Sequence, residues 1–200
     1  MSAVTADKVT AVILAGGKGR RFNGNDKGLI VFKQRPLIEH LLKAISPHVA
    51  QVLINANRNQ ETYANYGYPV ISDEMSDFQG PLAGFSVAMS KVTTSYIITL
   101  PCDAPFMIPN YVARMQETLN QSSAELAVAH DGERLQPVHA LIPIALKPSL
   151  DKFLQSGERK IDRWYAEHKM ISVDFSDQKE LFENINTAEQ LAELEAKNAG

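Results

Sequence analysis

Apolar runs of strand length alternate with amphipathic segments along the first half of the chain. The run VTAVILA, from Val9, is continuous and rich in β-branched residues, and SYIITLP, from Ser95, is a second strongly apolar run. Continuous runs of this kind are typical of strands that are buried on both faces of a sheet. Shorter strands are predicted at QVLINA (51–56) and PVISD (69–73), with a short extended piece at LIVF (29–32).

Helices are predicted between these strands, where apolar residues recur at helical spacing. Pro36 and the Gly-Pro pair at Gly80 mark two helix starts, since proline is favoured in the first turn. The predicted helices are PLIEHLLKAI (36–45), RNQETYANY (58–66), GPLAGFSVAMSKV (80–92), residues 109–120, ALKPSLDKFLQSG (145–157), RKIDRWYAEH (159–168) and NTAEQLAELEAKNAG (186–200).

The alternation of strand and helix predicts an α/β fold with a mostly parallel sheet and right-handed crossovers. Later in the chain ELAVAH (125–130), PVHALIP (137–143) and ISVDF (171–175) are strand candidates, and DGERLQ (131–136) forms a turn or a lid. We expect one domain over residues 1–200, with residues 1–8 as a flexible leader.

Composition narrows the possible functions. The chain has 200 residues and a formal net charge of −3, which argues against a broad nucleic-acid footprint. Cys102 is the single cysteine, so no intramolecular disulfide can form, which fits a reducing compartment. No apolar run reaches the roughly 18 residues of a membrane span. A cytoplasmic protein with no membrane partner is expected.

A glycine-rich, basic loop follows the first predicted strand. The segment LAGGKGRRFNGNDKG runs from Leu14 to Gly28 and holds five glycines. Successive glycine N–H groups can form an anion-binding nest, and mobile cations beside it suit a triphosphate. The basic residues of this loop are Lys18, Arg20, Arg21 and Lys27. The alternative interpretation is a flexible surface loop whose charges are solvated.

Two familiar phosphate-binding motifs do not fit this loop. A P-loop ends in Gly-Lys-Ser/Thr, whereas Lys27 is followed by Gly28. The dinucleotide fingerprint requires glycine or alanine at the position of Phe22.

Asp103 lies where the apolar strand from Ser95 ends. In parallel sheets ligands bind beyond the carboxyl ends of the strands, so this carboxylate is a candidate ligand for Mg²⁺. A turn or cap aspartate is the alternative, because Pro101 and Pro105 flank it. Cys102 is expected to be a small buried side chain, since no histidine is placed to activate it. The five histidines show no zinc spacing.

Other polar residues follow the neighbouring strands. Asn55, Asn57 and Arg58 follow the second strand and Asp73 the third; such side chains read a base edge or a ribose, and they are also common in turns. A second basic cluster comprises GERK, from Gly157, and Arg163. This cluster either binds a phosphate group of another substrate or lies at the start of a helix with its charges exposed to solvent.

The sequence resembles the molybdenum cofactor guanylyltransferases over nearly the whole chain, from Val9 to Leu191. LAGG with a basic loop is shared by many nucleotidyltransferases, whereas the later motifs are more specific. These motifs occur in the family's order: LAGGKGRRF…DKGL, VLINANRNQ, ISDE, GPLAG, PCDAPF, DGERLQPVHAL, SGERK, VDFSD and NINTAEQL.

The resemblance implies a Rossmann-like nucleotidyltransferase fold and transfer of GMP from GTP to molybdopterin, with Mg²⁺ as cofactor. It also implies contacts with other cofactor-biosynthesis proteins and molybdoenzyme chaperones. In the family pattern, the backbone of Leu14, Ala15 and Gly16 contacts GTP, and Lys27 pairs with the phosphates of GTP. The nucleoside is held by Asn55 and Asp73. Asp103 binds both the nucleotide and the metal ion. The pterin region matches Arg159, Lys160 and Arg163, although the family commonly has arginine where this chain has Lys160. Asn186 is either a second metal ligand or a helix cap.

Two other functions remain open at this point. A molybdopterin cytidylyltransferase is the nearest, but its loop usually reads LAAG, and Gly16 favours guanylyl transfer. A non-catalytic molybdopterin carrier would bind pterin without releasing pyrophosphate.

Overall fold

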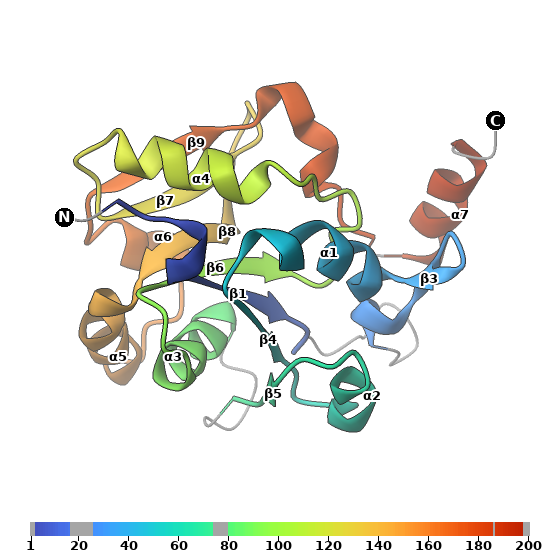
Figure 1. Ribbon diagram of the computed structural model, residues 1–200, viewed down its shortest axis with the longest axis horizontal. Helices are drawn as coiled ribbons and strands as arrows, with labels where there is room; N and C mark the ends of the chain where they lie inside the picture. The colour runs from blue at the N-terminus through green and yellow to red at the C-terminus, as the bar shows by residue number, and fades with distance from the viewer. Residues whose placement is uncertain (1–2, 17–25, 74–79, 186, 198–200) are drawn as a thin grey trace.

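The computed structural model describes residues 3–16, 26–73, 80–185 and 187–197. Within these residues a seven-stranded sheet runs through the centre of the molecule, with helices on both faces (Figure 1). In spatial order its strands are β5 (Val70–Ile71), β4 (Gln51–Asn55), β1 (Val9–Leu14), β6 (Tyr96–Pro101), β8 (Leu135–Pro143), β7 (Leu126–His130) and β9 (Met170–Asp174).

The sheet is mostly parallel, as predicted. Strand β1 pairs in parallel with β4 and with β6, β4 pairs in parallel with β5, and β7 with β9. Strand β8 is antiparallel to both of its neighbours, β6 and β7. A short turn joins β7 to β8, and strands joined by so short a connection can pair only in opposite directions.

Helices cover the two faces of the sheet in separate groups. Side chains from α1, α2 and α4 pack in the core on one face, and side chains from α3, α5 and α6 pack on the other. None of the helices within the described ranges is long and apolar enough to cross a membrane. The helices are α1 (Leu37–Ile45), α2 (Gln60–Ala64), α3 (Pro81–Lys91), α4 (Tyr111–Asn120), α5 (Lys147–Gln155), α6 (Ile161–Tyr165) and α7 (Ala188–Lys197).

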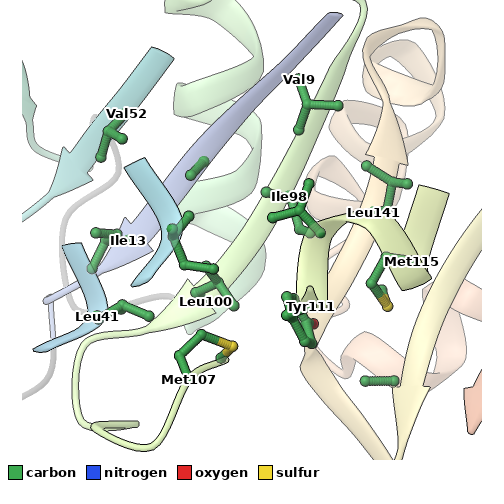
Figure 2. Close-up of a cluster of buried hydrophobic side chains, with 14 of the residues drawn as sticks. Val9, Ile13, Leu41, Val52, Ile98, Leu100, Met107, Tyr111, Met115 and Leu141 are labelled. Atoms are coloured by element: carbon green, nitrogen blue, oxygen red, sulfur yellow. The ribbon is translucent and has the colours of Figure 1, made fainter. Parts of the chain in front are cut away.

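The two central strands are fixed by apolar packing. Every residue of β1 from Val9 to Ile13 is buried, as expected for a strand that is covered on both faces. Figure 2 shows Ile13 of β1 and Leu100 of β6 in the same cluster as Leu41 of α1. The carboxyl ends of β1 and β6 therefore project from a rigid support.

Residues 3–8, which belong to the predicted leader, make contacts with α4. Val4 is 5% exposed, and its backbone N–H and C=O pair with the side-chain amide of Asn120 at 2.8 and 3.0 Å. The chain then forms a 3-10 turn over Ala6–Lys8. Apolar burial of one valine and two amide hydrogen bonds hold this segment against α4.

The segment DGERLQ forms the turn between β7 and β8, over residues 131–134, and the first two residues of β8. Asp131 Oδ1 accepts hydrogen bonds from the backbone N–H groups of Glu133 and Arg134, at 2.8 and 2.7 Å. Slight burial acts to raise the pKa of Asp131, but these hydrogen bonds lower it to about 2. Of the two alternatives drawn from the sequence, the described geometry is that of a turn.

A small hairpin stands beside the main sheet. Strands β2 (Val31–Phe32) and β3 (Arg35–Pro36) are antiparallel, and Lys33 and Gln34 between them have positive φ values of 47° and 66°. Phe32 packs with Leu37 and Ile185, and leucines of α7 lie against this cluster.

Trp164, the single tryptophan of the chain, belongs to α6 and contacts α5, and we call this contact the α5–α6 junction. Its side chain is 0% exposed, and its indole N–H donates to Ser149 Oγ at 3.2 Å. Helix α6 is held to β8 by the neighbouring Tyr165, whose hydroxyl donates to the carbonyl of Pro137 at 2.7 Å.

Candidate active site

The carboxyl ends of three adjacent strands form one edge of the sheet. Leu14, the last residue of β1, pairs with Asn55 of β4 and with Pro101 of β6. The pairing continues beyond the strands, because Ala15 N–H donates to Asn55 O at 2.8 Å and Cys102 N–H donates to Leu14 O at 3.1 Å. The predicted GTP contacts Leu14, Ala15 and Gly16 thus lie between Asn55 and Asp103 at this edge.

Lys27 and Asp103 form an ion pair at the same edge. Lys27 Nζ lies 2.9 Å from Asp103 Oδ2, and the two side chains are 27% and 8% exposed. The residues lie 76 positions apart in the sequence, so the fold brings the predicted phosphate clamp and the predicted metal ligand into contact.

Asn55, Asn57 and Asp73 form a second polar group beside the first. Asn55 Nδ2 donates to Asp73 Oδ1 at 3.0 Å, and Asn57 Nδ2 donates to Asp73 Oδ2 at 2.8 Å. The backbone N–H of Asp73 in turn donates to Asn57 Oδ1 at 2.8 Å. These hydrogen bonds fix the orientation of both amides, which the sequence could not decide.

Two glycines make room for this amide network. A Cβ atom at Gly16 would lie 3.0 Å from Asn57 Nδ2, and one at Gly84 would lie 2.7 Å from Asn55 Oδ1. Gly84 is in the first half of α3. Gly84 belongs to the GPLAG motif that was noted in the sequence, but the sequence did not predict its contact with Asn55.

Cys102 is a buried thiol directly behind Asp103. Its side chain is 5% exposed, and burial raises the pKa of the thiol well above its usual value. A thiol that stays protonated is a poor nucleophile. The prediction that Cys102 has a packing role therefore agrees with its surroundings.

The second basic cluster lies on another part of the molecule, at α5 and α6 (Figure 1). Arg159 Nη1 donates to the carbonyls of Leu154 and Glu158 at 2.7 and 2.6 Å, and Arg163 Nη1 donates to Glu158 Oε1 at 2.9 Å. Lys160 is exposed at the N-cap of α6. Arg159 thus supports the end of α5, a structural contact that the sequence did not predict.

Some of the predicted site residues fall outside the described ranges. Segment 17–25 contains Lys18, Arg20 and Arg21, and Asn186 is likewise undescribed. Within the described ranges no group of three or more histidine, cysteine, aspartate or glutamate side chains could hold a metal ion. A single carboxylate such as that of Asp103 could still serve a Mg²⁺ ion, which often takes one or two carboxylates and completes its shell with substrate phosphates and water.

Comparison with known proteins places the chain in a family. Residues 11–171 match the MobA-like NTP transferase domain. Proteins named molybdenum cofactor guanylyltransferase from Shewanella loihica and Shewanella halifaxensis are each 50% identical to this chain over 187 residues, which is 94% of this chain and 95% and 94% of theirs. The chain belongs to the molybdenum cofactor guanylyltransferases.

A solved structure supports the fold of this guanylyltransferase. Molybdopterin-guanine dinucleotide biosynthesis protein A from Archaeoglobus fulgidus superposes with a TM-score of 0.78 at 20% identity, covering 94% of this chain and 97% of that one. The predicted nucleotidyltransferase fold is confirmed, and the family membership identifies the chain as a nucleotidyltransferase.

Proposed function

We propose that the protein transfers GMP from GTP to molybdopterin and releases pyrophosphate. The observation that carries the proposal is the Lys27–Asp103 pair, 2.9 Å apart at the edge where the glycine loop begins. A cation for the phosphates and a carboxylate for a metal ion are the two groups that nucleotidyl transfer needs close together. The names of the relatives support guanosine as the nucleoside and the molybdenum cofactor as the acceptor.

In this proposal the described residues bind and orient the triphosphate. The backbone of Leu14, Ala15 and Gly16 contacts the nucleotide, while Asn55 and Asp73 hold the nucleoside. Asp103 would hold Mg²⁺, which supplies positive charge beside the phosphates. Lys27 holds the phosphates and stabilises the charge on the departing pyrophosphate.

The chemistry requires no general base in the protein. The terminal phosphate of molybdopterin forms the new bond to the α-phosphorus of GTP, and the bond to pyrophosphate breaks. A phosphate monoester is already ionised at pH 7, because its second pKa is about 6. Among the described residues near Asp103, the buried thiol of Cys102 keeps its proton, because burial raises its pKa, and it is not proposed as a base. The cytoplasmic location and the further protein partners remain predictions from the sequence.

A pyrophosphate assay with molybdopterin and each of the four triphosphates tests the function. We expect release with GTP. Release with CTP instead would identify a cytidylyltransferase, and pterin binding without any release would identify a carrier.

The nucleotide preference is expected to be measurable without the acceptor. We expect GTP to bind at least about tenfold tighter than CTP, roughly 1.4 kcal/mol, because Asn55 and Asp73 present fixed donors and acceptors. Calorimetric titrations with the two nucleotides measure the ratio. Equal affinities for GTP and CTP would contradict the prediction that the site distinguishes guanine from cytosine.

The basic cluster at residues 157–160 and Arg163 is the proposed binding region for molybdopterin, and a substitution there tests this assignment. Lys160 is exposed at the start of α6, and the hydroxyl of Tyr165 holds the other end of this short helix to Pro137 of β8. We expect Lys160→Ala to weaken molybdopterin binding by about tenfold, the scale of one charged hydrogen bond, and to leave GTP affinity unchanged.

Lys152→Ala, on the exposed side of α5, is the matched control for this variant. Arg159→Ala is less informative, because it also removes the hydrogen bonds to Leu154 and Glu158. A parallel fall in the affinities for pterin and GTP would rule out two separate regions.

A further inference from the structure

The segment that carries Lys27 is held by a buried contact with α2. Asp26 is 5% exposed, and its Oδ1 accepts a hydrogen bond from the hydroxyl of Tyr63 at 2.8 Å. Tyr63 is 0% exposed. Asn59 Nδ2 lies 3.4 Å from the other carboxylate oxygen, so both oxygens of Asp26 face α2 and the turn before it.

Tyr63 is the donor in its hydrogen bond with Asp26. Burial raises the pKa of the Tyr63 hydroxyl far above its usual range, so the hydroxyl keeps its proton and donates. A buried carboxylate requires such donors, because leaving it unpaired costs several kcal/mol. The contact is therefore a specific anchor and not a chance surface pair.

Gly28, the residue that follows Lys27, is also closely packed. A Cβ atom at Gly28 would lie 2.6 Å from Tyr63 Oη and 3.2 Å from Cys102 Cβ. Gly28 thus fits between α2 and the residue that precedes Asp103. Lys27 begins a 3-10 turn, Lys27–Leu29, in which Leu29 N–H donates to Asp26 O at 3.0 Å.

We infer that Tyr63 and Asp26 are positioning residues for Lys27. They fix the backbone on both sides of Lys27, so that its ammonium group is directed to the phosphates beside Asp103. The inference rests on the proposed function of Lys27 as the phosphate clamp. Neither Tyr63 nor Asp26 is proposed to touch the substrate.

The test measures GTP affinity in a double-mutant cycle of Tyr63→Phe and Lys27→Met. We expect Tyr63→Phe to weaken GTP binding by about tenfold in the wild-type background, since a misplaced cation loses much of a charge-assisted hydrogen bond. In the Lys27→Met background the same change should have no further effect, because there is no ammonium group left to position. Guanosine, which has no phosphates, should bind equally to all four proteins.

Tyr66→Phe is the matched control, because it removes a hydroxyl from the turn after α2 whose ring lies 6.4 Å from Tyr63. It should leave GTP affinity unchanged. Asp26→Ala removes the other partner of the hydrogen bond and should weaken GTP binding as much as Tyr63→Phe does. If one of these two variants folds poorly, the GTP affinity of the other still tests the inference.

The possible results separate the two hypotheses. If Lys27→Met alone leaves GTP affinity unchanged, the proposed role of Lys27 is wrong and this inference falls with it. If Lys27→Met weakens binding but Tyr63→Phe has no effect, or has the same effect in both backgrounds, Lys27 is the clamp and the positioning role is overturned.

Discussion

Asp103→Asn is expected to lower turnover by roughly 10²-fold or more while leaving the fold intact. The change keeps the shape of the side chain and removes the charge that would hold the metal ion, and a loss of this size is typical when one electrostatic stabiliser of a transition state is removed. The backbone carbonyl of Asp103, which accepts from Ile185 N–H at 3.2 Å, is unaffected. Turnover across a Mg²⁺ titration and the melting temperature are the measurements.

The structure also indicates why stability should change little. Lys27 loses its ion pair, but it is 27% exposed, so water can solvate the ammonium group. Asp7→Asn is the control, because Asp7 is exposed in the 3-10 turn before β1, at the opposite end of that strand from the site. Near-normal turnover with an unchanged Mg²⁺ dependence would exclude Asp103 as the metal ligand. A lower melting temperature with normal turnover would make it a structural residue.

The free energy of unfolding is expected to fall by about 3 kcal/mol more in the wild-type protein than in His139→Leu between pH 7 and pH 4. His139 is 2% exposed, and its ring lies 5.0 Å from that of Phe182 and 6.1 Å from that of Tyr111. Burial lowers its pKa from 6.5 to about 3. The folded protein therefore keeps this histidine neutral at pH values where the unfolded chain protonates it.

The sign of the pH dependence follows from that difference. Above about pH 6.5 neither state binds the proton, and the full stability is present. As the pH falls towards 3, only the unfolded chain gains the proton, which stabilises it by about 1.36 kcal/mol per pH unit. Denaturant titrations at several pH values measure this slope. An unchanged slope in His139→Leu would contradict the prediction.

The sequence predicted the elements that depend on local pattern. The apolar runs at Val9 and Ser95 became β1 and β6, and their carboxyl ends carry the residues that the motifs identified. Because the carboxyl ends of parallel strands lie at one edge of a sheet, the prediction of a parallel sheet was enough to expect Asn55, Asp73 and Asp103 at the same edge.

The contacts that the sequence could not predict are those between distant side chains. The Asp26–Tyr63 hydrogen bond joins residues 37 positions apart, and the periodicity of α2 indicates only that Tyr63 faces inward. The support of α5 by Arg159 was missed for a similar reason, since a basic side chain near a helix end suits either a ligand or a carbonyl cap. The burial of Val4 gave no signal in the sequence, because this valine has no large apolar neighbour at helix or strand spacing within the described residues 3–8.

The burial of Trp164 gives the protein a built-in optical label. With one indole in the chain, all of the tryptophan emission comes from the α5–α6 junction, which is 0% exposed at Trp164 and carries the basic cluster on its surface. The glycine loop and α2 contribute no indole of their own to this signal. Emission near the wavelength of an apolar environment would therefore report an intact junction, and a red shift would report its opening to water, separately from events at the nucleotide edge.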